Sequence, residues 1–237
     1  MSTFERIYAS PLHDPLFFWL AAALFVLALA ARLPFLAGFL VAFTFEIAAD
    51  ALATGALSPI PKGASWGTPV AVAFVILGDF RYFLLVERYR HEGGGARRSA
   101  GAVFGSAAAW AFLVPVGSFV LRNVVPSLAA PMRVTFLTYE LMFLVLALAL
   151  RLAVLPRTTA GAAPDVRRWL FEVTVFEIVQ YALWATADIV ILSGVPAGFL
   201  LRLVPNAMYY ALFLPFVLLR APARLRSWRG EGLSEKA

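Results

Sequence analysis

The chain contains seven apolar runs, each close to the length of about 20 residues that a helix needs to cross a bilayer. A helix that is apolar on every side is buried in a core or in a membrane. With 62% hydrophobic and 14% charged residues, the composition departs from that of a soluble domain in the same direction. The sequence therefore predicts an all-α, polytopic membrane bundle of seven transmembrane helices. The predicted spans are Pro15–Ala31, Phe35–Leu57, Thr68–Val86, Ala100–Leu121, Val134–Leu155, Trp169–Leu192 and Ala197–Leu219.

Most of the 20 Lys and Arg residues gather on one side of this topology. They include the stretch RYRHEGGGARR after the third span and the tail RAPARLRSWRGEGLSEKA. Because basic residues concentrate in cytoplasmic loops, we predict an outside N-terminus, a cytoplasmic C-terminus and a location in the plasma (inner) membrane. The net charge of +6 is then a topology signal, and we predict no nucleic-acid partner. Attraction to anionic lipid headgroups is a secondary interpretation of the same clusters.

The scarcity of certain side chains excludes several chemistries. Cysteine is absent, which removes disulfides, thiolate nucleophiles and iron–sulfur clusters. The two histidines, His13 and His91, fall near helix ends, which argues against a haem pair or a histidine-rich metal site. The two lysines, Lys62 and Lys236, lie outside the apolar runs, so a retinal Schiff base is excluded. We predict neither a cofactor nor a metal ion.

An internal repeat links the second and sixth spans. FEIAADAL (Phe45–Leu52) matches FEIVQYAL (Phe176–Leu183) at five of eight positions. The preceding spans also match, LALAARL (Leu27–Leu33) against LALALRL (Leu146–Leu152), although Ala and Leu are common in any membrane helix. A glutamate that recurs in register within lipid is hard to attribute to composition. We interpret the pattern as two copies of one unit.

The span after each copy carries a central polar residue and a tyrosine three positions later. These pairs are Asp79 with Tyr82 and Asn206 with Tyr209. The fourth span inverts the chain, so the two three-helix units have the same sense and form parallel repeats in a 3+1+3 arrangement. The predicted regions are residues 1–92 with the first repeat, 93–132 with the linker helix, 133–220 with the second repeat, and the basic tail 221–237.

Several polar side chains are expected at mid-depth, where an ionised group costs about 2.5–3.5 kcal/mol. Glu46 and Asp50 share one face of the second span, and Arg81 is the obvious cation to reach them from the third. Near the outer surface we expect an ion pair between Asp188 and Arg202. The candidate catalytic residues are Glu46, Asp50, Asp79 and Glu177, and the candidate substrate-binding residues are Arg81, Tyr82, Gln180, Tyr181, Asn206 and Tyr209.

Two interpretations of this set remain open. The polar residues can join helices by interhelical hydrogen bonds with no further role. Alternatively they form a site, since ionisable residues inside a membrane mark functional positions by default. We favour the site, because polar groups from both repeats are predicted to meet at one level.

One functional hypothesis is an intramembrane enzyme that uses a protonated carboxyl as general acid on an isoprenoid or similar lipid. The aromatic–Glu pair Phe45–Glu46 and the GDF motif Gly78–Phe80, within about seven helices, resemble the integral-membrane terpene cyclases and the membrane carotenoid cyclases and hydratases. The resemblance implies roles for Glu46 and Asp79. The chain departs from the terpene cyclases at Phe45, where they usually have Trp, and at Asn206, where they have an acidic residue.

The alternative hypothesis is a small-molecule transporter with its substrate between the repeats. The 3+1+3 layout is similar to that of the SWEET sugar carriers and the PnuC-type vitamin-precursor transporters. The proline–glutamine hinge of the sugar carriers is missing. The paired Gly/Pro interruptions expected of broken transport helices are also lacking, with Pro205 and Pro215 in the seventh span as the exceptions. A receptor or assembly protein without chemistry is the third hypothesis. The acidic residues concentrate in the first repeat, and this asymmetry favours an enzyme.

Overall fold

The computed structural model describes residues 2–10, 37–55, 57–61, 64–91, 98–128 and 132–226. Within these ranges the chain is helical and contains no strand, which confirms the predicted all-α class. Five helices of the described part are long and apolar enough to cross a membrane, and they correspond to the third to seventh predicted spans. They are Gly67–Tyr89, Ala100–Val124, Arg133–Thr158, Pro164–Leu192 and Gly198–Arg220.

The remaining predicted spans have different outcomes. Pro15–Ala31 lies outside the described residues. The second predicted span contains helix α3, Ala37–Thr54, which is 18 residues long. Before it, the short helix α1, Thr3–Tyr8, begins with a capping box in which Ser2 and Glu5 bond each other's backbone N–H groups. The seven-span count and the 3+1+3 repeat therefore stay predictions.

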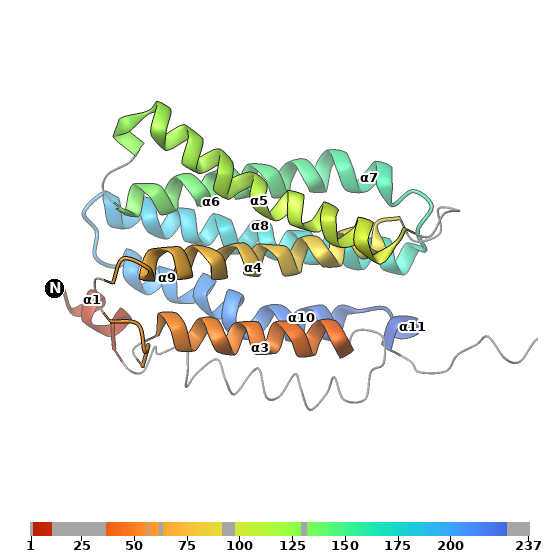
Figure 1. The fold of residues 1–237 in the computed structure, drawn as a ribbon, viewed down its shortest axis with the longest axis horizontal. Helices are drawn as coiled ribbons and strands as arrows, with labels where there is room; N and C mark the ends of the chain where they lie inside the picture. Colours follow the sequence, from red (N-terminus) through yellow and green to blue (C-terminus); the bar gives the residue numbers. More distant parts are fainter. Residues whose placement is uncertain are drawn as a thin grey trace, which may run out of the picture.

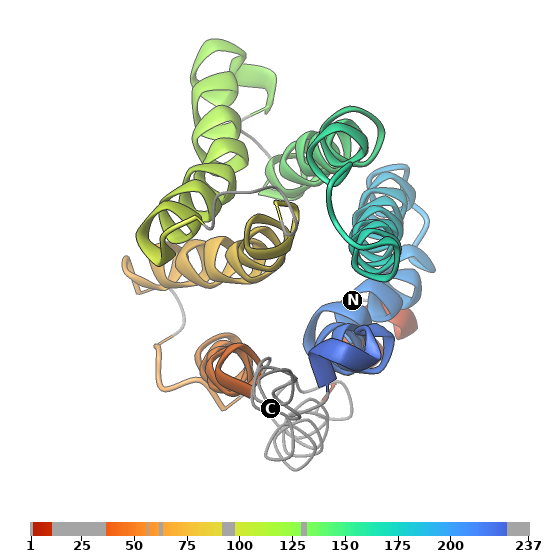
Figure 2. The ribbon, with the colours of Figure 1, turned by 90° about the vertical axis from the view of Figure 1, so that its right-hand side faces the viewer.

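The long helices run roughly parallel to one another (Figure 1). They are α4 (Gly67–Tyr89), α5 (Ala100–Val124), α6 (Met132–Ala149), α8 (Pro164–Leu192), α9 (Gly198–Ala207) and α10 (Phe213–Arg220). Neighbours in the chain pack together from α3 to α4, α5, α6, α8 and α9, and α10 closes back on α3. The end-on view in Figure 2 shows this ring. Because α4 also contacts α8, side chains from α3, α4, α8 and α10 can meet inside the bundle.

Short elements connect or extend these helices. The 3-10 turn η2, Pro126–Leu128, follows α5, and the last described helix is α11, Ala223–Arg226. Helix α8 begins at Pro164, five residues before the predicted apolar boundary, because proline suits the first helical turn, where its missing N–H would have no partner anyway.

Two π-helical segments interrupt the long helices close to prolines. Segment η3, Leu150–Val154, leads into α7, Leu155–Thr158, where Pro156 has no N–H to donate. Segment η4, Met208–Leu212, separates α9 from α10, between Pro205 and Pro215. Such segments frequently occur at functional sites, and η4 contains Tyr209.

Aromatic packing fills the centre of the bundle. Phe143 of α6 stacks on Tyr181 of α8 with ring centroids 3.8 Å apart and planes inclined by 18°. Phe143 also lies against Tyr82 and Phe83 of α4, at 6.3 and 5.7 Å. All four rings are buried. The contacts join α4, α6 and α8 and thereby set the positions of Tyr82 and Tyr181.

Helices α8 and α9 approach closely at Gly198. A Cβ atom at this position would lie 2.6 Å from Ile191 Cγ1 and 2.8 Å from the backbone oxygen of Ala187. The second neighbour is backbone and cannot rotate away. Glycine is therefore required for this approach.

We predict that Gly198→Ala destabilises the purified protein by about 1–3 kcal/mol, as overpacking of a close contact does. Gly105→Ala is the matched control, because a Cβ there meets nothing within 4 Å. Alanine also favours the helix by roughly 0.5–1 kcal/mol. Thermal unfolding in one detergent measures both variants. Equal melting temperatures for the two would contradict the proposed tight contact.

Candidate functional site

Arg81 is the central cation of the bundle. Its side chain projects from α4 and is 1% exposed. Its Nη2 atom donates to the backbone oxygen of Tyr209 at 2.8 Å, and its guanidinium lies over the rings of Tyr209 and Phe213, with Cζ 4.3 and 4.6 Å from their centroids. Arginine stays protonated in proteins. This buried charge therefore needs carboxylates near it.

The two glutamates of the repeated FEI motif both lie within electrostatic reach of Arg81. Glu46 comes from α3, and its Oε2 is 3.9 Å from Arg81 Nη1. Glu177 comes from α8 and is 3% exposed. We expected Arg81 to reach Glu46 or Asp50 across to the second span, and the structure places it beside Glu46. Within the described residues neither oxygen of Glu46 has a hydrogen-bond partner, although both are buried.

Asp79 has a very different environment. Tyr181 of α8 donates its hydroxyl to one carboxylate oxygen at 2.5 Å. Tyr139 of α6 donates to the other oxygen in a short hydrogen bond. Asp79 is 3% exposed and also interacts electrostatically with Arg81. Two hydroxyl donors suit an ionised carboxylate, which accepts hydrogen bonds and donates none.

Asp50 and Gln180 lie beside these groups. Asp50, one turn beyond Glu46 on α3, accepts from the Thr54 hydroxyl at 3.2 Å and interacts with the hydroxyls of Tyr209 and Tyr210. Gln180 points its amide at Glu177, with Nε2 3.5 Å from Oε2. Including Asp79, four carboxyl groups interact with the single guanidinium of Arg81. This part of the site has an excess of acid.

Tyr82 links helices α4 and α8 through a hydrogen bond between two neutral hydroxyl groups. Its hydroxyl donates to Thr174 Oγ1 at 3.0 Å, across from α4 to α8. Thr174 in turn donates to the backbone oxygen of Leu170 at 2.8 Å. Tyr82 therefore packs beside the carboxyl groups without bonding to any of them in the described structure.

The position of Tyr209 depends on Gly78 and on the π-helical segment η4. A Cβ at Gly78 would overlap the Tyr209 ring, so glycine lets the ring lie against α4, where its hydroxyl donates to the Phe74 oxygen at 3.2 Å. In η4 the N–H of Phe213 bonds the oxygen of Met208, five residues back. The Tyr209 oxygen is thus released from the regular i to i+4 pattern and accepts Arg81 instead.

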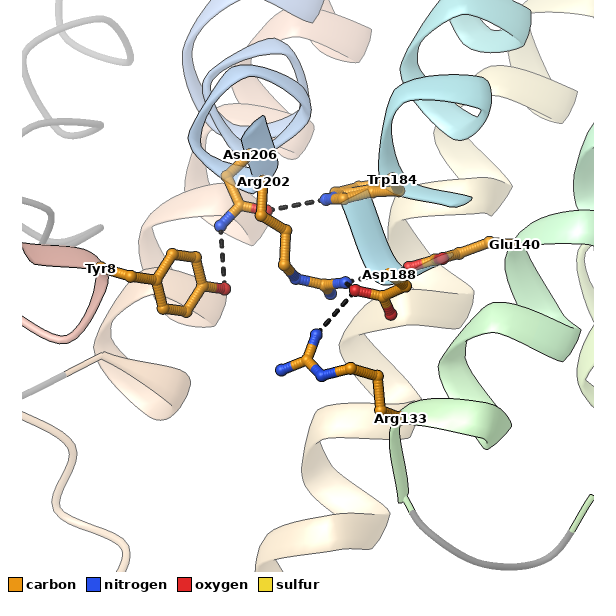
Figure 3. A network of polar contacts seen from close by, with 7 residues as sticks. All are labelled: Tyr8, Arg133, Glu140, Trp184, Asp188, Arg202 and Asn206. Atoms are coloured by element: carbon orange, nitrogen blue, oxygen red, sulfur yellow. Dashed lines mark hydrogen bonds and ion pairs between the residues drawn. The ribbon is translucent and has the colours of Figure 1, made fainter. Parts of the chain in front are cut away.

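Asn206 belongs to a second polar network, the outer network, which joins α1, α6, α8 and α9 (Figure 3). Its members are Tyr8, Arg133, Glu140, Trp184, Asp188, Arg202 and Asn206. Asn206 accepts from Trp184 Nε1 at 2.8 Å and donates to Tyr8 at 3.3 Å. Among the described residues, its hydrogen bonds go to Trp184 and Tyr8 and not to the candidate residues around Arg81. The connection runs through Trp184, whose ring lies 5.2 Å from Tyr181 and 5.6 Å from Tyr209.

The same network confirms the expected ion pair between Asp188 and Arg202. Arg133 also donates to Asp188 at 2.6 Å, and Arg202 lies 3.3 Å from Glu140. Two arginines therefore face two carboxyl groups, which balances the charge and ties α6, α8 and α9 together.

A third network lies where α4 ends and α5 begins, at the other end of the bundle from Asp188 and Arg202. Glu87 is buried and pairs with Arg90 at 2.7 Å and Arg98 at 2.5 Å, and it accepts from Trp110 Nε1 at 2.8 Å. Partial burial, followed by the charges of Arg90 and Arg98, lowers the pKa of His91. The sequence predicted neither Glu87, the partner of Arg90 and Arg98, nor Tyr139, a partner of Asp79.

Comparison with protein families, with curated proteins and with solved structures finds no match for this chain. Within the described residues, no group of three or more His, Asp or Glu side chains is placed to hold a metal ion. The chain is a helical membrane protein with buried carboxyl groups.

The bonds to Asp79 predict a difference between otherwise similar tyrosine variants. Tyr181→Phe removes a hydrogen bond to a charged group and should cost about 1.5–3 kcal/mol, whereas Tyr82→Phe removes a bond between neutral hydroxyls and should cost about 0.5–1.5 kcal/mol. Both rings are buried and keep their packing. Reversible unfolding in detergent gives the two values, and a Tyr82→Phe cost equal to or above that of Tyr181→Phe would mean that Asp79 is not ionised.

Proposed function

We propose that the protein is an intramembrane acid catalyst that protonates an isoprenoid or related lipid. The single observation behind the proposal is the unequal hydrogen bonding of its carboxyl groups. Asp79 accepts two tyrosine hydroxyls, whereas neither oxygen of Glu46 accepts a hydrogen bond within the described residues. A proton donor and a charged stabilising group are the two components that acid catalysis in an apolar site requires.

The assignment of roles follows from the cost of charge in lipid. Arg81 is balanced by one ionised carboxylate, and each further ionised group at that depth costs about 2.5–3.5 kcal/mol. Asp79 is the best placed to hold the negative charge, because two hydroxyls solvate it. Glu46 then carries a proton and serves as the general acid. Glu177, Asp50 and Gln180 complete the polar wall around Arg81.

The proposed step balances without a cofactor. Glu46 transfers its proton to one carbon of a substrate double bond, which leaves a carbocation on the other carbon. A second double bond of the same substrate closes a ring on that cation, or a water molecule adds to it. Loss of a proton from the product cation restores the acid at Glu46. Cyclisation is thus an isomerisation, and hydration consumes one water.

Aromatic side chains beside Glu46 would support the cation. Phe39, Phe43, Phe80 and Phe104 form a continuous series from α3 across α4 to α5, with successive ring centroids 4.8, 6.3 and 4.7 Å apart. Phe39 and Phe43 precede Glu46 on α3 by seven and three residues, which places them on its side of the helix. The faces of aromatic rings attract cations. The resemblance of the FE and GDF motifs to the membrane terpene cyclases agrees with this chemistry.

A transporter is the second candidate, and one observation favours it. The π-helical segment η4 breaks the last span beside the Arg81 site, between Pro205 and Pro215. Discontinuous helices whose backbone groups are free to bind ligands are typical of transporter sites. Here, however, Arg81 already occupies the released oxygen of Tyr209, which is why we rank catalysis first.

The test is lipid-extract mass spectrometry of a bacterial host that makes long-chain isoprenoids. Cells that express the wild type should accumulate a cyclised or hydrated isoprenoid. Glu46→Gln should lower its amount by about 100-fold or more, since a general acid contributes about that factor at least. Glu140→Gln is the matched control, because it makes the same change at a buried glutamate of the outer network and should leave the product.

Equal product from wild type and Glu46→Gln would exclude Glu46 as the acid. The absence of any new lipid in the wild-type cells would favour the transporter, and a screen for small molecules that raise the melting temperature would follow. Equal loss in Glu46→Gln and Glu140→Gln would indicate a general folding defect, which expression levels in the membrane fraction would reveal.

A further inference from the structure

A groove outside the Arg81 site combines a basic mouth with an apolar floor. Its volume is about 550 Å³, and it lies between α8, η3, η4 and α10. The basic mouth comprises Arg151, Arg168 and Arg220, with Glu172 between the last two. The apolar floor comprises Phe171, Val175, Phe176, Val179, Met208 and Phe216.

The groove follows one stripe of helix α8. Arg168, Glu172, Val175 and Val179 succeed one another at spacings of three or four residues, which places them on one side of the helix. From Arg168 to Val179 the helix rises about 16 Å at about 1.5 Å per residue. That is roughly half the 30 Å thickness of the hydrocarbon layer. The groove is therefore long enough to extend from the headgroup level to mid-membrane, which is the length of an acyl chain in one leaflet.

The charges in the mouth leave a surplus of positive charge. Glu172 accepts from Arg168 Nε at 2.9 Å and from Arg220 Nε and Nη2 at 2.8 and 2.7 Å. Arg151 has no carboxylate partner among the described residues, and its Cζ lies 4.0 Å from the Phe171 ring centroid. Three guanidinium groups with one carboxylate carry a net charge of about +2. Arg168 and Arg220 are 77% and 47% exposed, so both are accessible.

From this charge and shape we infer that the groove binds an anionic phospholipid, with the phosphate at Arg151, Arg168 and Arg220 and one acyl chain along the apolar floor. A soluble anion would not use the apolar floor, and a neutral lipid would not use the surplus charge. Basic pockets between membrane helices on the cytoplasmic side bind acidic headgroups in this way. The basic mouth lies at the end of the bundle that the positive-inside rule assigns to the cytoplasm. The site does not depend on the chemistry proposed for Glu46.

The charge of the basic mouth is tested with Arg151→Gln on the full-length protein. The matched control is Arg157→Gln, because Arg157 is exposed near the same end but does not line the groove. Native mass spectrometry of the detergent-solubilised protein, titrated with phosphatidylglycerol or phosphatidylcholine, measures binding. We expect preferential binding of phosphatidylglycerol by the wild type and by Arg157→Gln. Arg151→Gln should bind it about fivefold more weakly, as loss of about 1 kcal/mol per basic residue implies.

The apolar floor is tested with Val179→Trp, which fills the groove without changing its charge. Val145→Trp is its control, since Val145 is 66% exposed on α6 and outside the groove. Only Val179→Trp should weaken phosphatidylglycerol binding. Equal binding of the two lipids by the wild type would overturn the proposal, as would equal weakening by Arg151→Gln and Arg157→Gln, which would indicate unspecific attraction to basic surface. Unchanged binding by Val179→Trp would overturn the place of the acyl chain.

Discussion

The buried guanidinium of Arg81 is the constraint on which the arrangement of this bundle depends. A charge that is 1% exposed cannot be left alone in an apolar surrounding, because an isolated buried ion costs several kcal/mol. Arg81 interacts with Asp79 on its own helix and with polar groups from distant parts of the chain: Glu46 on α3, Glu177 on α8, and the backbone oxygen of Tyr209 in η4. Arg81 therefore interacts with groups on three separate segments, α3, α8 and η4, which surround α4. These interactions form a polar centre within an otherwise apolar bundle.

The backbone around Arg81 is adapted to this role at two places. Gly78, one turn before Arg81 on α4, leaves room for the Tyr209 ring, and that ring then forms one of the two aromatic faces over the guanidinium. The π-helical step in η4 shifts the Phe213 N–H to the oxygen of Met208 and leaves the Tyr209 oxygen for the arginine. A regular helix would have used that oxygen internally. The π-helical segment thus departs from the regular backbone hydrogen bonds of an α-helix, and the Tyr209 oxygen accepts a hydrogen bond from the buried guanidinium.

The sequence predicted the parts of the molecule that follow from composition and spacing. Apolar runs predicted the five long helices, because the thickness of the bilayer sets the length of an apolar span. As the obvious cation within the bundle, Arg81 was expected to reach Glu46 or Asp50, and it lies 3.9 Å from Glu46. The sequence identified Tyr181 as a candidate residue but did not predict its bond to Asp79, because the two lie 102 residues apart. Tyr139, 60 residues from Asp79, was missed altogether, because an isolated tyrosine in a membrane helix carries no local signal. The direct partners of Asn206 were missed for a similar reason: residue spacing on one helix does not determine whether an amide meets a tryptophan or a carboxylate on another.

The three polar networks differ in charge balance, and the difference supports the role proposed for the carboxyl groups around Arg81. In the outer network Arg133 and Arg202 face Asp188 and Glu140, so the charges cancel. At the other end Arg90 and Arg98 both pair with Glu87, as expected beside a basic loop. In the middle one arginine serves four carboxyl groups. Helix association alone does not require an excess of acid there, since one carboxylate balances Arg81 and each further ionised carboxylate adds a desolvation cost. Protonated carboxyl groups would avoid that cost, and the acid catalysis proposed for Glu46 requires a proton held in this way. The acid excess around Arg81 therefore distinguishes this network from the two that only tie helices together.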